Sequence, residues 1–215
     1  KMKNPHNFTE KTFKGSVPQM IKQTLDYLST NIVYEVVQKV SGKQEANRFW
    51  NYPYDALEEA VVNSLYHRAY DQHEPVEITV EPSGISILNC PGPDRSIPMS
   101  DIEKGEILKS RRYRNRYLGD FLKELDLTEG RSTGVPTIQE KLAANGSPRA
   151  TFETTDDRLT FLIHIPVHAG CENNLLVLAN KKLSNGSEKT DNSSEVGSEK
   201  ETKGSELSSE KGHAS

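Results

Sequence analysis

Two side chains in the stretch DALEEAVVNSLYHRAYDQH have the types and the spacing expected of a functional site. Glu59 and Asn63 are four residues apart, and in an α-helix this spacing places them one turn above each other on the same side. The stretch itself is expected to be an amphipathic helix, because its apolar residues follow helical spacing. The carboxylate and the amide therefore form either an ordinary solvated helix edge or one wall of a site.

A second group of candidates lies in the loop GRSTG, which leads into a predicted helix. Backbone N–H groups at the start of a helix attract phosphate, and glycines let a ligand approach them closely. Arg131, Ser132 and Thr133 add a guanidinium and two hydroxyl groups between Gly130 and Gly134. A simple turn between two helices, capped by Ser132 or Thr133, is the alternative interpretation.

A basic segment, KSRRYRNR, runs from Lys109 to Arg116 and holds five basic residues in eight. Such a cluster around a tyrosine is typical of contact with phosphate groups, either of a nucleic acid or of a nucleotide. A solvated, charged loop explains the cluster equally well. The candidates in this segment are Arg111, Arg112, Arg114 and Arg116.

The elements that must position these side chains form a regular order of helices and hairpins. The patterns predict a helix over 16–32, a hairpin over 32–50, a helix after Pro53, a hairpin over 75–90, a long loop with a short helix near Asp101, helices over 115–127 and from Gly134 to Asn145, and a hairpin over 149–168. In the helix over 115–127 we expect Leu118, Phe121, Leu122 and Leu125 to face inward. Because the strands come in antiparallel pairs, the predicted class is α+β, a mostly antiparallel sheet with helices on one face.

The composition separates a globular part from a polar tail. We expect residues 13–168 to form one domain after a short disordered segment over 1–12. Residues 169–215 are rich in Ser, Glu and Lys, and such a segment buries too little apolar surface to fold. It is therefore expected to be a linker to a further module, with NNLLVLAN as one apolar island that is a candidate docking segment.

The remaining composition narrows the class of protein. The net charge of −4 gives no argument for nucleic-acid binding by the chain as a whole. Cys90 and Cys171 have neither metal-ligand nor redox spacing. The N-terminus does not resemble a signal peptide, and no apolar run is long enough to span a membrane. A soluble, cytoplasmic protein without membrane contact is expected.

Three segments in this order resemble a known family: YPYDALEEAVVNSLYHRAY, ISILNCPGP and RNRYLGDFLKELDLTEGRSTGVPTIQEKLAANG. They are similar to the ATP-binding domain of bacterial RecG-related transcriptional regulators, a divergent branch of the GHKL group. The resemblance covers residues 13–168 and implies a two-layer α/β sandwich of the Bergerat type that binds ATP and Mg²⁺. No Walker A loop, GxxxxGK[ST], occurs in the chain, so helicase activity is not expected.

The resemblance also implies roles for the helix side chains. By this comparison Asn63 is the Mg²⁺ ligand through its amide oxygen, and Glu59 is the general base that acts on the attacking water. His67 and Arg68 match a family pattern, and either side chain is a candidate to face phosphate, although a histidine at the end of a helix also favours the helix dipole without a ligand. Ala69 stands where the family has an acidic residue. A metal cluster of His67, Asp71 and His73 is a weaker alternative, because no second cluster supports it.

The same resemblance places two residues beside the base of the nucleotide. Asn89 stands where the group has an aspartate that accepts a hydrogen bond from the adenine amino group, and Gly92 stands among the glycines beside the base. Pro91 replaces a glycine of the family pattern and removes a backbone donor. A strand that ends in a Pro-Gly turn needs no ligand and is the alternative interpretation.

Three functions remain open from the sequence. The leading one is an ATP–Mg²⁺-binding module of a bacterial regulator, with slow or no hydrolysis, so that only weak ATPase activity is considered. The second is a degenerate GHKL fold that serves as a protein–protein or homodimerisation module. The third is an accessory DNA-binding domain that uses the cluster from Lys109 to Arg116, with DNA also a candidate partner of other domains in the full-length protein.

Overall fold

The computed structural model describes residues 9–171, except 40–41, 43–44, 110–113 and 129–132. The described part contains, in chain order, α1 (Val17–Asn31), β1 (Glu35–Lys39), β2 (Ala46–Trp50), α2 (Tyr54–His67), β3 (Glu77–Glu81), β4 (Gly84–Asn89), α3 (Met99–Lys104), α4 (Arg116–Glu124), α5 (Gly134–Ala144), β5 (Thr151–Thr154), β6 (Phe161–Pro166) and a 3₁₀ turn (Ala169–Cys171). This order confirms the predicted alternation of helices and hairpins, including the short helix near Asp101.

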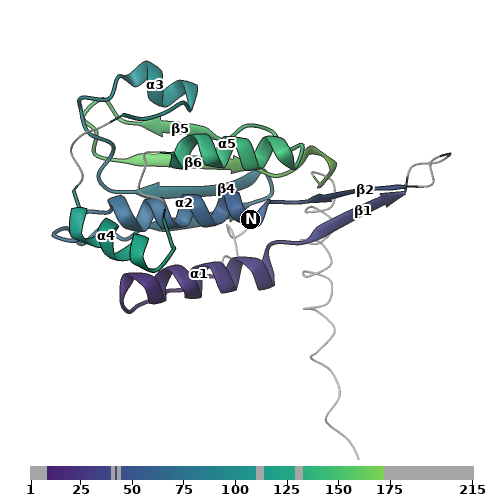
Figure 1. Ribbon diagram of the computed structural model, residues 1–215, viewed down its shortest axis with the longest axis horizontal. Helices are drawn as coiled ribbons and strands as arrows, with labels where there is room; N and C mark the ends of the chain where they lie inside the picture. The colour runs from purple at the N-terminus through teal and green to yellow at the C-terminus, as the bar shows by residue number, and fades with distance from the viewer. Residues whose placement is uncertain (1–8, 40–41, 43–44, 110–113, 129–132, 172–215) are drawn as a thin grey trace, which may run out of the picture. The chain divides into compact units, whose positions relative to one another are not determined.

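The main sheet has the strand order β3-β4-β6-β5, and every neighbouring pair is antiparallel. The two central strands are in register, with Ile85 opposite Ile165 and Ile87 opposite Ile163, and all four of these side chains are buried. Figure 1 shows α2 and α5 covering one face of this sheet, and α2 contacts α1, α5 and β4. The described part of the chain is therefore a two-layer α+β structure with a mostly antiparallel sheet, as the sequence predicts.

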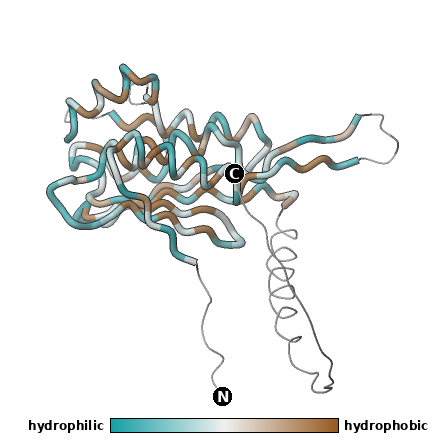
Figure 2. The backbone as a smooth tube through the Cα atoms, turned by 90° about the horizontal axis from the view of Figure 1, so that it is seen from below, coloured by the Kyte–Doolittle hydropathy of each residue, from teal (hydrophilic) through white to brown (hydrophobic). Residues whose placement is uncertain are grey.

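α2 forms the centre of the helical layer because its apolar residues repeat every three or four positions. Leu57, Val61 and Leu65 are buried by this spacing, together with the small residue Ala60, which leaves room for neighbouring backbones. Figure 2 shows hydrophobic segments recurring along the strands and the helices of the two layers. In the described part of the chain, no helix is both long and apolar enough to cross a membrane.

α2 and α5 run antiparallel, and one contact near each end defines this arrangement. Lys141 near the end of α5 forms an ion pair with Asp55 in the first turn of α2, with 2.9 Å between Nζ and Oδ2. Gly134 at the start of α5 lies against Asn63 in the last turns of α2. The antiparallel packing therefore brings the beginning of α5 to the pair Glu59 and Asn63.

The inward-facing side chains that we predicted for α4 are only partly correct. Leu122 is fully buried and Leu118 packs against the core, but Phe121 and Leu125 are 49% and 45% exposed. A helix turns consecutive residues about 100° apart, and the buried face of α4 is centred on Leu122 and too narrow to include Phe121. Leu125 lies beyond the last helical residue. The prediction of the helix is thus correct, but the predicted buried face is wider than the one in the structure.

The first hairpin, β1 and β2, forms its own two-stranded sheet and does not join the main one. Figures 1 and 2 both show it extending away from the two layers, and we refer to β1 and β2 as the arm. Its base is held by Asn51, whose side chain is fully buried. The Oδ1 atom of Asn51 accepts hydrogen bonds from the backbone N–H groups of Tyr34 (2.8 Å) and Tyr52 (2.9 Å), and its Nδ2 donates to the carbonyl of Ile32 (2.8 Å).

Candidate functional site

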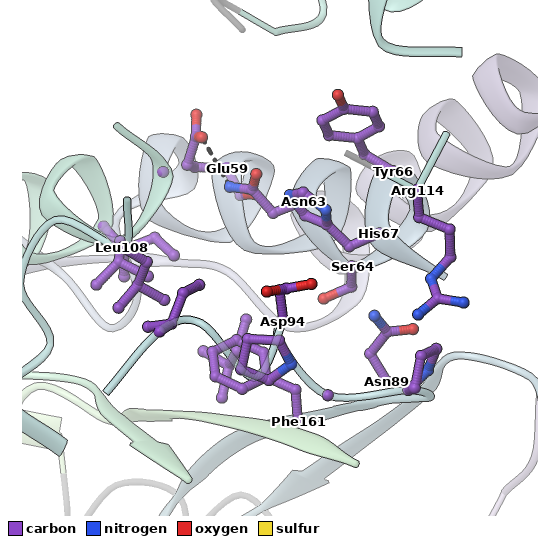
Figure 3. Close-up of a pocket in the computed structure, with 18 of the residues that line it drawn as sticks. Glu59, Asn63, Ser64, Tyr66, His67, Asn89, Asp94, Leu108, Arg114 and Phe161 are labelled. Carbon is purple, nitrogen blue, oxygen red and sulfur yellow. Dashed lines mark hydrogen bonds between the residues drawn. The ribbon is translucent and has the colours of Figure 1, made fainter. Parts of the chain in front are cut away.

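A cavity of about 400 Å³ lies between α2, the loop after β4 and the start of α5. Most of the described site candidates line it, namely Glu59, Asn63, His67, Asn89, Gly92, Arg114, Thr133 and Gly134. Figure 3 shows Glu59, Asn63 and His67 on α2, with Asn89 and Asp94 on the opposite side. This volume lies within the range of small-molecule sites, which is about 300–1,000 Å³. The fold therefore assembles side chains from distant parts of the sequence around one hollow.

Glu59 and Asn63 contact each other directly, as their helical spacing predicts. The Nδ2 atom of Asn63 donates to Oε1 of Glu59 (2.7 Å) and also to the backbone carbonyl of Glu59 (2.8 Å). Both acceptors lack a hydrogen to donate, so the amide nitrogen must face them. Its oxygen is consequently the atom left for a ligand, and in the described part of the chain nothing donates to it. An amide oxygen in this position suits a hard divalent cation.

Gly134 is the residue that allows α5 to start so close to this pair. A Cβ atom at position 134 would clash with Nδ2 of Asn63 and would lie 2.9 Å from Oε1 of Glu59. Such contacts are too short for a folded protein, so any larger side chain must displace Asn63 or the helix. Gly134 therefore permits close packing of protein on protein, whereas the sequence analysis considered it only as a place for ligand approach.

The first backbone N–H groups of α5 are positioned for an anion. Thr137 donates the first helical hydrogen bond to the carbonyl of Thr133 (2.8 Å), so the N–H groups of Gly134 and Val135 have no acceptor inside the helix. All three of Thr133, Gly134 and Val135 line the cavity. The partial positive charge of the helix start adds to these donors. Gly130, Arg131 and Ser132 lie outside the described residues, so their proposed part in this loop stays a prediction.

Asn89 is the other polar side chain that the fold buries against the cavity. It ends β4, is only 2% exposed, and its Oδ1 atom is buried without a hydrogen-bond partner among the described residues. Buried polar atoms are almost always paired, because an unpaired one loses its hydration without compensation. The unpaired oxygen of Asn89 is thus suited to accept a hydrogen bond from a ligand in the cavity.

Gly92 lines the cavity, yet its lack of a side chain serves the protein itself. A Cβ atom there would lie 2.6 Å from both Oγ1 of Thr154 and the carbonyl of Thr160. Its backbone N–H donates to the carbonyl of Arg158 (2.9 Å), in the turn between β5 and β6. The glycine therefore holds the loop after β4 against the last hairpin.

Ala69 stands where the family has an acidic residue. It is fully buried and donates its N–H to the carbonyl of Cys90 (3.0 Å).

His67 and Arg114 lie together in the lining of the cavity. His67 keeps exposed surface, but the protein around it disfavours its charged form, and the guanidinium of Arg114 adds to this effect; both lower the pKa of His67 below its usual value. Histidine is then neutral near pH 7, so the permanent positive charge at this side comes from Arg114. Asn115 fixes the position of Arg114, because its Nδ2 donates to the carbonyls of Tyr66 and Arg68 at the end of α2, both at 2.7 Å.

Other candidates lie away from the cavity or outside the described residues. The Nε atom of Arg68 donates to the carbonyl of Glu74 (3.0 Å), and its guanidinium lies over the ring of Tyr70, 5.2 Å from the centroid. Arg68 therefore contacts the segment after α2 and is not among the described residues that line the cavity. Arg116 is exposed in the first turn of α4. Arg111 and Arg112 lie outside the described residues.

The alternative metal cluster of His67, Asp71 and His73 is not assembled. Within the described ranges, no three residues among histidine, cysteine, aspartate and glutamate come together closely enough to hold a metal ion. The short sequence separation of these residues was misleading, because His67 belongs to α2 and the chain turns away directly after it. As far as the described residues go, a metal at the cavity would therefore take most of its ligands from water or from a bound phosphate.

Asp94 and Tyr66 line the cavity and were missed by the sequence analysis. Asp94 lies in the loop after β4, and its Oδ1 accepts a hydrogen bond from the N–H of Ser96 (2.9 Å). Tyr66 packs against α4 at Gly119, where a Cβ atom would lie 2.5 Å from the tyrosine hydroxyl. An acid in the segment CPGPD was the available signal for Asp94, whereas the helical pattern marks Tyr66 only as a core residue.

The described part of the chain is thus a two-layer α+β domain with a polar cavity between α2 and α5. Residues 73–163 match a family model described as "Putative ATP-dependent DNA helicase recG C-terminal", which confirms the resemblance to RecG-related ATPase domains over that segment. The match begins after α2 and covers β3, β4, α3, α4 and α5, so it includes the loop after β4 but not Glu59 and Asn63. The interpretation of that pair therefore depends on its own geometry.

A crystal structure of the DIP2311 protein from Corynebacterium diphtheriae is similar to this chain, with a TM-score of 0.53 and 20% sequence identity. The similarity covers 68% of this chain and 29% of that protein, so this chain spans less than a third of its length. At this identity the comparison supports the fold alone. No curated protein matches the sequence.

Proposed function

We propose that the cavity binds a nucleoside triphosphate, most simply ATP, together with Mg²⁺. The observation that carries this proposal is the orientation of Asn63. Its nitrogen is held by Glu59, so its oxygen is left for a cation within the cavity that also receives the start of α5. A divalent cation and a helix start that lie side by side at one hollow suit a phosphate chain, whose oxygens bind both.

The other groups of the cavity fit the remaining parts of such a ligand. The N–H groups of Gly134 and Val135 would hold phosphate oxygens, and Arg114 would add positive charge to the lining of the same cavity. The unpaired oxygen of Asn89 would accept a hydrogen bond from an exocyclic amino group, which adenine supplies. Bound Mg²⁺ would neutralise part of the phosphate charge. The role of the domain within a transcriptional regulator and DNA contact by the cluster from Lys109 to Arg116 stay predictions from the sequence.

Titration of ATP into the full chain, with and without Mg²⁺, tests this proposal by calorimetry and by the shift in thermal unfolding. We expect saturable binding with Mg²⁺ at a dissociation constant between about 1 μM and 1 mM, and clearly weaker binding with EDTA. Inorganic triphosphate separates the phosphate contacts from the base contact. Absence of both heat and thermal shift at millimolar ATP with Mg²⁺ contradicts the proposal.

Glu59 is proposed to accept a proton from the water that attacks the terminal phosphate, and this role predicts a separation of binding from turnover. The Glu59→Gln variant keeps an oxygen that can accept the hydrogen bond from Asn63, but it cannot act as a base. We expect it to bind ATP within about threefold of the wild type and to lower any slow phosphate release by about 10²- to 10⁴-fold. Single-turnover phosphate release measures this effect.

The neighbouring carboxylate supplies the matched control. Glu58 lies on the same helix and does not line the cavity, so Glu58→Gln removes a neighbouring carboxylate that has no contact with a ligand in the cavity. We expect wild-type binding and turnover from this variant. Equal turnover by Glu59→Gln and wild type would show that Glu59 is not the base, while leaving the binding proposal intact.

A further inference from the structure

The arm carries an open edge on β1, and hydrogen bonds at its base show which backbone groups face outward. The N–H of Trp50 donates to Oδ1 of Asn145 (2.9 Å), and Nδ2 of Asn145 donates to the carbonyl of Trp50 (2.7 Å). Both backbone groups of Trp50 therefore point away from β1, and Asn145 blocks the outer edge of β2 at this position.

In an antiparallel ribbon, residue pairs that exchange backbone hydrogen bonds alternate with pairs whose backbone groups point outward. The orientation of Trp50 therefore determines the orientation of the other backbone groups along the arm. Trp50 lies opposite Glu35, so this pair does not exchange hydrogen bonds, whereas the N–H of Asn51 donates to the carbonyl of Tyr34 (3.0 Å) in the adjacent pair. It follows that Val36 and Gln38 face β2, and that the N–H and carbonyl groups of Glu35, Val37 and Lys39 face outward. Within the described ranges no strand pairs with this edge of β1.

The sequence of β1, EVVQK, has an acidic residue at one end and a basic residue at the other, so two antiparallel copies place opposite charges next to each other. In an antiparallel pair of two β1 strands related by a two-fold axis at Val37, the two valines lie opposite each other. Glu35 of one copy then lies opposite Lys39 of the other, at both ends of the pair. An axis at Glu35 or at Lys39 places like charges opposite each other, and the axis at Val37 is the one that pairs all three outward-facing residues.

We propose that two copies of this chain associate through the outer edges of their β1 strands, which gives a continuous sheet of the order β2-β1-β1-β2. Three opposed pairs of outward-facing residues would exchange backbone hydrogen bonds, and the two Glu35–Lys39 pairs would set the register. The interface is isologous, since the same five residues meet on both sides. The proposal does not depend on nucleotide binding, because the arm contributes no residue to the lining of the cavity.

The exposed apolar side chains of the arm agree with this partner. Val37 is 47% exposed and Trp50 is 45% exposed, and both belong to the same face of the ribbon, since Val37 pairs with Arg48 and Glu35 pairs with Trp50. Pairing of two β1 strands would bring the two Val37 side chains into contact and extend this apolar face. A two-stranded ribbon is marginally stable by itself, and two further strands would support it.

Charge exchange between the two ends of β1 tests the register. In Lys39→Glu both opposed pairs become Glu–Glu, and in Glu35→Lys both become Lys–Lys, so each variant alone is expected to self-associate at least about tenfold more weakly than wild type. An equimolar mixture of the two variants restores an opposite-charge pair at both ends. We therefore expect the mixture to form a heterodimer with close to wild-type affinity, measured by sedimentation equilibrium of the full chain.

Amide exchange supplies a readout that depends on the backbone pairing itself. The amide of Val37 is expected to become protected as protein concentration rises, while the inward-facing amides of Val36 and Gln38 are protected at every concentration. Unchanged far-ultraviolet circular dichroism verifies that the variants fold. A monomeric wild type at concentrations up to about 1 mM, or a mixture of variants that stays monomeric, overturns the proposal.

Discussion

Replacing Asn63 by alanine is expected to weaken the binding of Mg²⁺–ATP by about 100-fold, in line with the loss caused by disturbing a metal site. The variant lacks the amide oxygen proposed to bind the cation, and Oε1 of Glu59 loses the donor that lies 2.7 Å away in the wild type. Binding in the presence of EDTA should change much less, because the phosphate contacts of α5 remain. Calorimetric titration with and without Mg²⁺ measures both quantities.

Two further variants, Asn63→Asp and Asn47→Ala, test whether the loss of binding is specific to the amide oxygen of Asn63. Asn63→Asp keeps an oxygen for the cation but turns the hydrogen bond with Glu59 into a contact between two carboxylates. It should therefore bind Mg²⁺–ATP better than Asn63→Ala, yet less well than wild type. Asn47 is exposed on the arm, and its replacement by alanine should have no effect on binding. If Asn63→Ala binds Mg²⁺–ATP as tightly as wild type, the metal role of Asn63 is wrong.

The largest effect on stability is expected at Asn51. Asn51→Ala removes three side-chain hydrogen bonds in a fully buried position and leaves the N–H groups of Tyr34 and Tyr52 without their acceptor. An unsatisfied buried polar group costs about 1–3 kcal/mol, so we expect the free energy of unfolding to fall by about 2–4 kcal/mol. Urea unfolding followed by circular dichroism measures this loss.

The same exposed Asn47→Ala variant serves as the control for stability, and it should change the free energy of unfolding by no more than about 0.5 kcal/mol. Retention of wild-type stability by Asn51→Ala would show that the network at the base of the arm contributes little. A second readout is local: because Asn51 joins the arm to the body, the fluorescence of Trp50, the single tryptophan, should respond before the rest of the domain unfolds.

The sequence predicted those parts of the fold that depend on local periodicity. The six strands and five helices of the described part were expected in the correct order, because hydrophobic spacing and turn residues mark them strongly. The contact between Glu59 and Asn63 was also predictable, since helix geometry alone brings residues four apart together. What these predictions share is that each depends on residues close together in the chain.

The rest depends on contacts between distant segments, which periodicity does not encode. Arg68 is turned toward Glu74 and Tyr70 by the path of the chain after α2. Asn115 links the start of α4 to the end of α2, and no sequence pattern marks it as more than a helix cap. The separate arm likewise follows from the clasp formed by Asn51, which joins residues up to 19 positions apart.

The two glycines of the cavity have an evolutionary consequence. Gly92 and Gly134 are each required by protein atoms, Thr154 and Thr160 in one case and Asn63 in the other. A descendant of this chain that had lost its ligand would still be selected to keep Gly92, because the last hairpin depends on it. If Asn63 binds the cation as proposed, it would by contrast be released from selection once no cation had to be bound. Among related sequences, an asparagine at the position of Asn63 should therefore distinguish chains that bind a ligand from chains that keep only the fold.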